Sequence, residues 1–231
     1  MMENFDYIKN NYESLLGEID TISATLGVKA PTLVSVTKSG SDEELLALAS
    51  FGAADIGENR PGEVMRRGEI LRNAGFLPRM HEIGTLQRNK IKLIADTVHM
   101  IHSVDSFALA KDINRHAEAR GRVIPILIEV NSAKEEQKSG VFPEDTERFL
   151  YEISEFKNIK ISGLMTMGPV SEDPEQLRPY FRATKALFDK LDSLYGFGAG
   201  ATLSMGMSDS YRVAIEEGST LIRVGRKLFK K

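Results

Sequence analysis

The chain has no cysteine in its 231 residues, which excludes disulfide bonds, thiolate catalysis and cysteine-ligated metals. It also has little excess charge: the formal net charge is -3, so we expect no basic field for nucleic acid or an anionic membrane. No apolar run approaches the roughly 20 residues that a membrane span requires. The first residues, Met1 to Asp6, are acidic and lack the apolar region of a signal peptide. These absences predict a cytoplasmic protein that binds neither nucleic acid nor membrane.

Two further absences concern the organisation of the chain. No Gly-x-Gly-x-x-Gly follows the first strand-like segment, so nothing indicates dinucleotide binding. No linker, low-complexity tract or break in composition divides the sequence. We therefore expect one domain over residues 1–231, a length that α/β barrels commonly use.

The hydrophobic pattern alternates between strand and helix. After an amphipathic helix over 5–26, apolar strand-like runs occur at 32–36, 54–57, 79–84, 98–104, 123–130, 159–165, 201–203 and 220–224. Helical patterns separate them at 42–51, 61–73, 86–95, 106–120, 143–156, 173–195 and 208–217. Eight strands that alternate with helices at this length predict a single (β/α)8 TIM-type barrel with an extra N-terminal helix. An open, doubly wound sheet is the alternative.

The most unusual local pattern is a lysine at the end of the first strand. Leu33 to Val36 are strand-prone, and Thr37-Lys38-Ser39-Gly40 follows directly. An ammonium group beside a buried strand costs desolvation energy unless the protein uses it. The hypothesis is a Schiff-base lysine that carries pyridoxal 5′-phosphate (PLP). The alternative is a surface lysine that happens to follow a strand.

Other polar and glycine residues also fall at predicted strand ends, where barrels place their chemistry. They are Lys38, Glu58-Asn59, Ile83-Gly84, His102-Ser103, Met165, Ser204 to Ser208 and Arg223 to Gly225. The loops after strands seven and eight commonly hold phosphate through backbone N–H groups. The Ser204-Met205-Gly206-Met207-Ser208 turn and the Arg223-Val224-Gly225 segment fit such a site. The alternatives are a plain loop with Ser208 as a helix N-cap and an outward-facing Arg223.

The four histidines show no metal-ligand spacing. We interpret His81 and His102 as hydrogen-bonded core or rim residues. His99 and His102 are three apart on one strand and are expected on opposite faces of the sheet. The sequence shows no pattern typical of a Ser/His/Asp catalytic set or of a pair of carboxylates acting as acid and base.

Together these segments resemble the YggS/PROSC pyridoxal-phosphate homeostasis proteins along nearly the whole chain. The matching motifs are Val34-Ser35-Val36-Thr37-Lys38, Gly57-Glu58-Asn59, His81 to Lys90, Ile101 to Asp105, Lys138-Ser139-Gly140, Gly163-Leu164-Met165, Leu203 to Ser208 and Ile222 to Gly225. The resemblance implies a barrel like the N-terminal domain of alanine racemase, with PLP as an internal aldimine on Lys38. It also implies that Arg223 faces the pyridine nitrogen.

The resemblance further implies the other cofactor contacts. Phosphate would be held by Ser204, the backbone of Met205 and Gly206, and Gly225, while Asn59 would lie beside the ring. The expected cofactor-binding set is therefore Lys38, Asn59, Ser103, Met165, Ser204, Met205, Gly206, Arg223 and Gly225. The chain departs from the family pattern at Arg60, Met80 and Arg226, and Arg226 stands where a small hydroxyl residue is common.

Three functions share Lys38. The preferred one is a monomeric, non-catalytic PLP carrier of vitamin B6 homeostasis, with apo PLP-dependent enzymes as transient recipients. An amino-acid racemase would need a second acid/base, and Tyr211 is the tyrosine nearest the predicted rim; no second domain is expected to supply one. An arginine opposite the ring nitrogen disfavours transamination, because it does not hand over a proton. The third possible function is a Schiff-base aldolase, which would need a nearby acid/base set that we cannot identify in the sequence.

Overall fold

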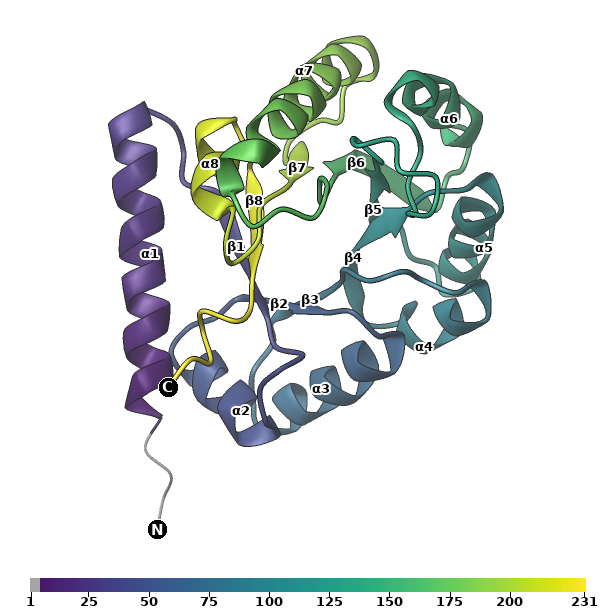
Figure 1. Cartoon of the computed structure of the whole chain (residues 1–231). Helices are drawn as coiled ribbons and strands as arrows, with labels where there is room; N and C mark the ends of the chain where they lie inside the picture. The colour runs from purple at the N-terminus through teal and green to yellow at the C-terminus, as the bar shows by residue number, and fades with distance from the viewer. Residues whose placement is uncertain (1–4) are drawn as a thin grey trace.

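Eight parallel strands close into a barrel in the computed structural model, which describes residues 5–231 (Figure 1). Each strand pairs with its sequence neighbours, and β8 pairs with β1 to complete the circle. The strands are β1 (Thr32–Val36), β2 (Asp55–Glu58), β3 (Arg79–Glu82), β4 (Val98–Val104), β5 (Ile124–Glu129), β6 (Ile159–Met165), β7 (Thr202–Ser204) and β8 (Leu221–Val224). The predicted (β/α)8 barrel is confirmed.

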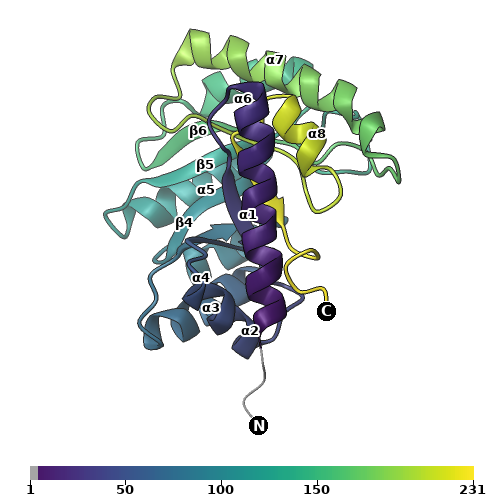
Figure 2. The same ribbon diagram turned by 90° about the vertical axis from the view of Figure 1, so that its left-hand side faces the viewer.

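Helices form a ring around the strands (Figure 1). They are α1 (Asp6–Leu26), α2 (Asp42–Ser50), α3 (Pro61–Asn73), α4 (Ile91–Ile94), α5 (Phe107–Glu118), α6 (Thr146–Ile153), α7 (Arg178–Tyr195) and α8 (Tyr211–Glu216). In the described residues no helix follows β8, and α1 contacts both α2 and α8. The N-terminal helix therefore completes the ring, as Figure 2 also shows, and is not additional to it.

Several predicted helices are shorter in the structure. The segment predicted as a helix over 86–95 contains a 3-10 turn at Arg88–Lys90 and the single turn of α4, and no side chain caps either start. The turn before α8 is held by Ser210, whose Oγ accepts a hydrogen bond from Met207 N at 3.1 Å. Ser210 and not Ser208 stands at the start of α8, so the N-cap reading of Ser208 is wrong.

The layer between strands and helices is aliphatic. Outward-facing residues such as Ile56, Ile101 and Ile126 have no exposed surface and belong to one continuous cluster with the helices. Burial of such side chains contributes about 1.5–3 kcal/mol each, which is what holds the helices on the barrel. No helix within residues 5–231 combines the length and apolarity that a membrane crossing demands.

Candidate functional site

A cavity of about 830 Å³ opens at the carboxyl ends of the strands. Parallel barrels place their ligands at this end, where the loops after each strand converge. Among the residues that line it are Val36, Lys38, Asn59, Ile83, Gly84, Ser103, Glu129, Lys138, Met167, Met207, Ser208, Arg223, Gly225 and Arg226. Of the nine predicted cofactor residues, Lys38, Asn59, Ser103, Arg223 and Gly225 meet at this one cavity.

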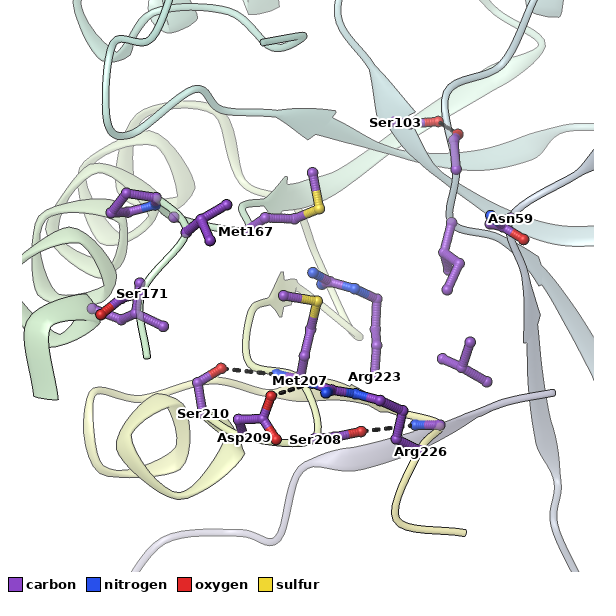
Figure 3. Close-up of a pocket in the computed structure, with 18 of the residues that line it drawn as sticks. Asn59, Ser103, Met167, Ser171, Met207, Ser208, Asp209, Ser210, Arg223 and Arg226 are labelled. Atoms are coloured by element: carbon purple, nitrogen blue, oxygen red, sulfur yellow. Dashed lines mark hydrogen bonds and ion pairs between the residues drawn. The ribbon is translucent and has the colours of Figure 1, made fainter. Parts of the chain in front are cut away.

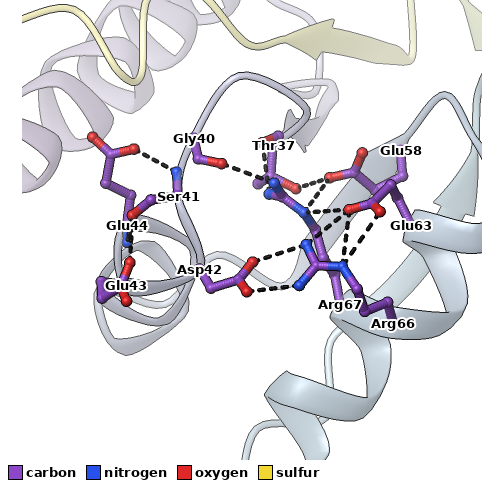
Figure 4. Close-up of polar contacts among 10 residues, drawn as sticks. All are labelled: Thr37, Gly40, Ser41, Asp42, Glu43, Glu44, Glu58, Glu63, Arg66 and Arg67. Carbon is purple, nitrogen blue, oxygen red and sulfur yellow. Dashed lines mark hydrogen bonds and ion pairs between the residues drawn. The ribbon is translucent and has the colours of Figure 1, made fainter.

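Lys38 lies two residues beyond β1, and its side chain is exposed at the wall of the cavity. The turn that carries it is held from behind by Arg67 of α3 (Figure 4). The Arg67 guanidinium donates to Thr37 O at 2.7 Å and to Gly40 O at 2.8 Å. The apolar residues before Lys38 suggest that it is buried with the strand, but its side chain is exposed. The buried Arg67 fixes the backbone on both sides of the lysine.

The same turn is fixed by two carboxylates. Glu58 accepts a hydrogen bond from Thr37 Oγ1 at 2.5 Å and lies 3.4 Å from Arg67 Nε. Glu44 closes a capping box with Ser41, so α2 starts immediately after the lysine turn (Figure 4). The position of the Lys38 backbone therefore depends on three neighbouring elements: β2, α2 and α3.

Asn59 and Ser103 lie on the side of the cavity away from Met167 and Ser171 (Figure 3). Ser103 Oγ donates to Gly84 O at 2.5 Å. Gly84 packs so closely on Asn59 that an added Cβ would lie 2.3 Å from Asn59 O. A glycine is required there because any side chain would push the β2 and β3 loops apart. These contacts hold Asn59 beside the cavity.

Arg223 of β8 points into the barrel, and its side chain is almost fully buried. Its Nη1 donates to Ser204 Oγ at 2.5 Å and its Nη2 donates to Thr166 O at 3.2 Å. Burial lowers the pKa of Arg223 to about 10, and the nearby Glu129 opposes that shift. The guanidinium therefore remains protonated at neutral pH, and it lines the cavity that Lys38 lines.

Glu129 at the end of β5 is a cavity residue that the sequence reasoning missed. Burial raises its pKa to about 7, Asp105 adds to the rise, and Arg223 opposes it. The signal was present in the sequence, since Glu129 ends the apolar run Ile124 to Ile128 at a strand end. Its carboxyl group can exchange a proton near neutral pH within the cavity.

The loops after β7 and β8 bring phosphate-compatible donors to the cavity, among them Ser208 and Arg226 (Figure 3). Gly225 N donates to Ser208 Oγ at 3.3 Å, which leaves the hydroxyl hydrogen of Ser208 available, and Arg226 forms an ion pair with Asp209. An added Cβ on Gly225 would lie 2.9 Å from Val36 O, so only glycine lets this loop approach β1. A hydroxyl donor and a cation are thus gathered beside the closely packed Gly225 backbone, which suits a phosphate group.

The other four predicted residues, Met165, Ser204, Met205 and Gly206, do not line the cavity. The Ser204 hydroxyl bonds Arg223 inside the barrel, and Met205 N donates to Leu221 O at 3.1 Å. An added Cβ on Gly206 would lie 2.5 Å from Ala214 Cβ, so this glycine allows α8 to pack. The Ser204 hydroxyl and Met205 N thus have partners within the barrel, and the phosphate contacts of Ser204, Met205 and Gly206 stay a prediction.

Met165 lies in the floor beneath the cavity. With Met100 and Leu127 it forms a small buried apolar cluster inside the barrel. Its backbone pairs with Glu129 on one side and Ser204 on the other. It supports cavity residues and is not exposed to the cavity itself.

Three of the four histidines, His81, His99 and His102, lie together on β3 and β4, whereas His116 is on α5. His81 and His102 are buried and hydrogen-bonded to each other at 3.0 Å, as predicted for core histidines. The rings of His99 and His102 both contact the ring of His81, at 5.3 and 5.2 Å between centroids. The prediction that His99 and His102 face opposite sides is wrong, because the β3–β4 register shifts between Met80 and His81.

No tyrosine of the described residues lines the cavity. Tyr211 is buried at the start of α8, where its hydroxyl contacts Glu18 of α1 and accepts from Lys227 Nζ at 2.8 Å. Its phenol therefore joins the helix ring and does not stand opposite Lys38. In the same described range, no group of three or more His, Asp or Glu side chains could hold a metal ion.

Comparison with known proteins extends over nearly the whole chain. Residues 10–230 match the sequence profile of the alanine racemase N-terminal domain. A pyridoxal phosphate homeostasis protein of Aquifex aeolicus is 39% identical over 203 residues, which are 88% of each chain. A solved structure of an unknown protein from Bifidobacterium adolescentis has TM-score 0.90 at 32% identity, covering 99% of this chain and 98% of that one. PipY of Synechococcus elongatus, solved with PLP bound, has TM-score 0.84 at 27% identity, covering 96% of this chain and all of PipY.

Proposed function

This chain belongs to the alanine racemase N-terminal domain family and, within it, to the pyridoxal phosphate homeostasis proteins, and we propose that it binds PLP and acts in PLP homeostasis. The observation that carries the proposal is one cavity that brings the Lys38 amine, the Arg223 guanidinium and a phosphate-compatible rim together. An aldehyde cofactor with a ring nitrogen and a phosphate needs these three kinds of partner.

The residues fit that group. Lys38 Nζ would join the cofactor aldehyde as a Schiff base, and Arg223 would donate to the ring nitrogen. Ser208, Gly225 and Arg226 would lie at the phosphate, and the predicted phosphate contacts of Ser204, Met205 and Gly206 remain part of the proposal. Asn59 and Ser103 would stand beside the ring, as members of the cavity wall.

Carriage rather than turnover is the preferred role. A racemase that uses Lys38 as one base needs a second acid/base on the other face of the substrate. Tyr211 was the candidate nearest the rim, and its hydroxyl is occupied by Glu18 and Lys227 away from the cavity. Glu129, the titratable carboxyl of the cavity, is the group that a racemase would have to use instead, and the curated relatives, which are pyridoxal phosphate homeostasis proteins, favour carriage. Sustained alanine racemisation that disappears in Lys38→Ala would reverse this preference.

We propose apo PLP-dependent enzymes as the recipients of the cofactor and a cytoplasmic, monomeric protein as the carrier. Support for a recipient comes from the exposed apolar rim of the opening, where Val170 is 92% exposed and Met167 and Met207 are partly exposed. Light scattering during PLP transfer to an apo-enzyme tests both ideas. A stable dimer of the carrier would contradict the monomer.

The first experiment is the visible spectrum of the protein with added PLP, followed by borohydride reduction and peptide mass mapping. We expect a yellow protein with the pyridoxyl mass on Lys38, and neither colour nor mass shift in Lys38→Ala. Lys138→Ala is the matched control, because Lys138 also lines the cavity but pairs with Glu135 at 2.7 Å. It should retain the label on Lys38. A colourless wild-type protein, or a label that stays in Lys38→Ala, would overturn the proposal.

A further inference from the structure

A continuous series of hydrogen bonds crosses the inside of the barrel beneath the cavity. Arg223 Nη1 is 2.5 Å from Ser204 Oγ, which is 3.1 Å from His102 Nδ1. His102 Nε2 is 3.0 Å from His81 Nδ1, and His81 Nε2 is 2.9 Å from Asp55 Oδ1. All five residues are at least nine-tenths buried. The series joins β8, β7, β4, β3 and β2.

For two neutral imidazoles, the acceptor-only carboxylate of Asp55 sets the direction of every hydrogen bond. Arginine can only donate, so the Ser204 oxygen accepts from Arg223 and its own hydrogen is free to point at His102 Nδ1. His102 then carries its hydrogen on Nε2 and donates to His81 Nδ1. His81 in turn donates from Nε2 to Asp55, whose ionised carboxylate can only accept. Each hydrogen therefore points from the cation at the cavity toward the anion at the other end.

Asp55, the last residue of the series, remains an ionised carboxylate. Asp55 begins β2, at the rim opposite the cavity, where Arg79 also donates to it at 2.6 and 2.5 Å. Although burial opposes it, hydrogen bonds from Arg79 and His81 lower the pKa of Asp55 to about 2. Burial is the main cause that holds the pKa of His102 well below its usual range, and the charge of Arg223 adds to it. Asp55 is therefore charged and His102 neutral at physiological pH, as the direction of the series requires.

Arg223 needs such an arrangement because it has no direct counter-ion. In the described part of the chain, no carboxylate oxygen lies within ion-pair distance of its guanidinium. A buried cation without compensation is costly, and hydrogen bonds aligned head to tail polarise one another in a low-dielectric interior. An ion pair made directly to Arg223 would consume the donors that face the cavity. A series ending on a distant carboxylate stabilises the cation and leaves those donors available.

Resting on the PLP-binding function proposed above, we propose that Asp55, His81, His102 and Ser204 are positioning residues for cofactor retention. Together they form a one-directional hydrogen-bond relay from the far rim of the barrel to Arg223. The relay holds the guanidinium in one orientation and keeps it a donor toward the ring nitrogen of PLP. The residue at the far end, Asp55, thus acts on the cofactor without touching it.

The first test needs no cofactor. Nitrogen NMR of the PLP-free protein labelled at its histidine rings reports which ring nitrogen carries the hydrogen. We expect the Nε2–H form for both His81 and His102 in the wild type, and a changed His102 signal in Ser204→Ala. An Nδ1–H form of His102 in the wild type would overturn the relay, because its direction would be reversed.

The second test is PLP affinity, measured by absorbance titration. Asp55→Asn keeps the shape but removes the anion, and Ser204→Ala removes the link next to Arg223; each should weaken PLP binding by about tenfold. Ser204→Thr restores the hydroxyl and should recover most of the loss, which a purely structural defect would not. Arg79→Gln is the matched control, because it removes the other partner of Asp55 and leaves the carboxylate and the His81 bond; it should stay within about threefold of wild type.

The outcomes separate the two proposals. If the wild type binds PLP and both Asp55→Asn and Ser204→Ala bind it equally well, the relay has no role in retention. If Asp55→Asn does not fold, Ser204→Ala with its threonine rescue decides the same question. If the wild type binds no PLP, the proposed function fails, while the histidine spectra still decide the direction of the relay.

Discussion

The inside of this barrel and the layer between its strands and helices are both buried, but they are built from different side chains. The outer layer is almost entirely aliphatic, with residues such as Ile56 and Ile101 fully excluded from water. The inside contains Arg223, His102 and Asp55, where barrels usually pack branched aliphatic residues. The difference indicates that the outer layer supplies the stability of the fold, whereas the inside is arranged to serve the cavity.

The barrel interior itself has an apolar side and a polar side. On one side Met100, Leu127 and Met165 form the small apolar cluster below Glu129. On the other side the relay ends at Arg223. A flexible apolar floor adapts its shape to what lies above it, whereas a polar series has one arrangement in which every group is satisfied. The polar side is therefore the part of the interior that can impose an orientation.

The largest expected effect comes from a substitution in the outer layer that leaves the side chains inside the barrel unchanged. Ile101→Ala removes a fully buried side chain next to His102 in sequence but on the other face of β4. We expect the free energy of unfolding to fall by about 4 kcal/mol, from lost burial and the cavity left behind. Chemical denaturation measures it, and PLP affinity of the folded protein should stay within about twofold of wild type. A large loss of PLP affinity with little loss of stability would contradict the division.

A second prediction concerns a polar exception in the outer layer. Glu82 shares a face of β3 with Met80, which packs on α3, and its Oε2 has no hydrogen-bond partner among the described residues. Burial raises the pKa of Glu82 to about 8; its bond from Gly84 N opposes the rise, and Glu58 adds to it. The folded protein therefore binds this proton more tightly than the unfolded chain, and Glu82 makes stability fall as pH rises from about 5 to about 8.

Across that range the loss attributable to Glu82 should be about 3 kcal/mol. Glu82→Gln should flatten this part of the curve of unfolding free energy against pH, because an amide does not titrate. Glu129 contributes to the slope in the same direction, so the difference between wild type and variant is the quantity to measure. Glu144→Gln, at an exposed carboxylate paired with Lys134, is the control and should retain the wild-type slope. Parallel curves for wild type and Glu82→Gln would refute the assignment.

The smallest expected effect lies at the cavity rim. Arg226 and Asp209 form an ion pair with both side chains mostly in water. Exposed pairs of this kind contribute below about 1 kcal/mol, so Arg226→Ala should weaken PLP binding by only about threefold, with less effect at high salt. Arg212→Ala removes an exposed arginine that pairs with Glu18 away from the cavity, and it should leave the affinity unchanged. A tenfold loss in Arg226→Ala would mean that the rim, and not the interior, dominates retention.

The fold followed from the sequence because its signals are local. Period-two and period-3.6 patterns, together with glycine and proline at the ends of elements, are each read within about a dozen residues. Eight repeats then leave few ways to bury all the strands. Lys38, Asn59, Ser103, Arg223 and Gly225 could be predicted for the same reason: each lies at or just beyond a strand end, and all strand ends of a parallel barrel meet at one opening.

What the tertiary structure decided is how polar groups are shared across the barrel. Ser204 was predicted at the phosphate, but its hydroxyl bonds His102, 102 positions away in sequence. A one-residue register shift on β4 lets both His99 and His102 contact the ring of His81. Strict alternation of side chains along the strand would place them on opposite faces. A hydrogen bond depends on atoms being within a few tenths of an ångström, whereas sequence spacing only assigns a face. The sequence therefore determined the barrel and its opening, while the closing of the strands decided which side chains reach the cavity and which support it from below.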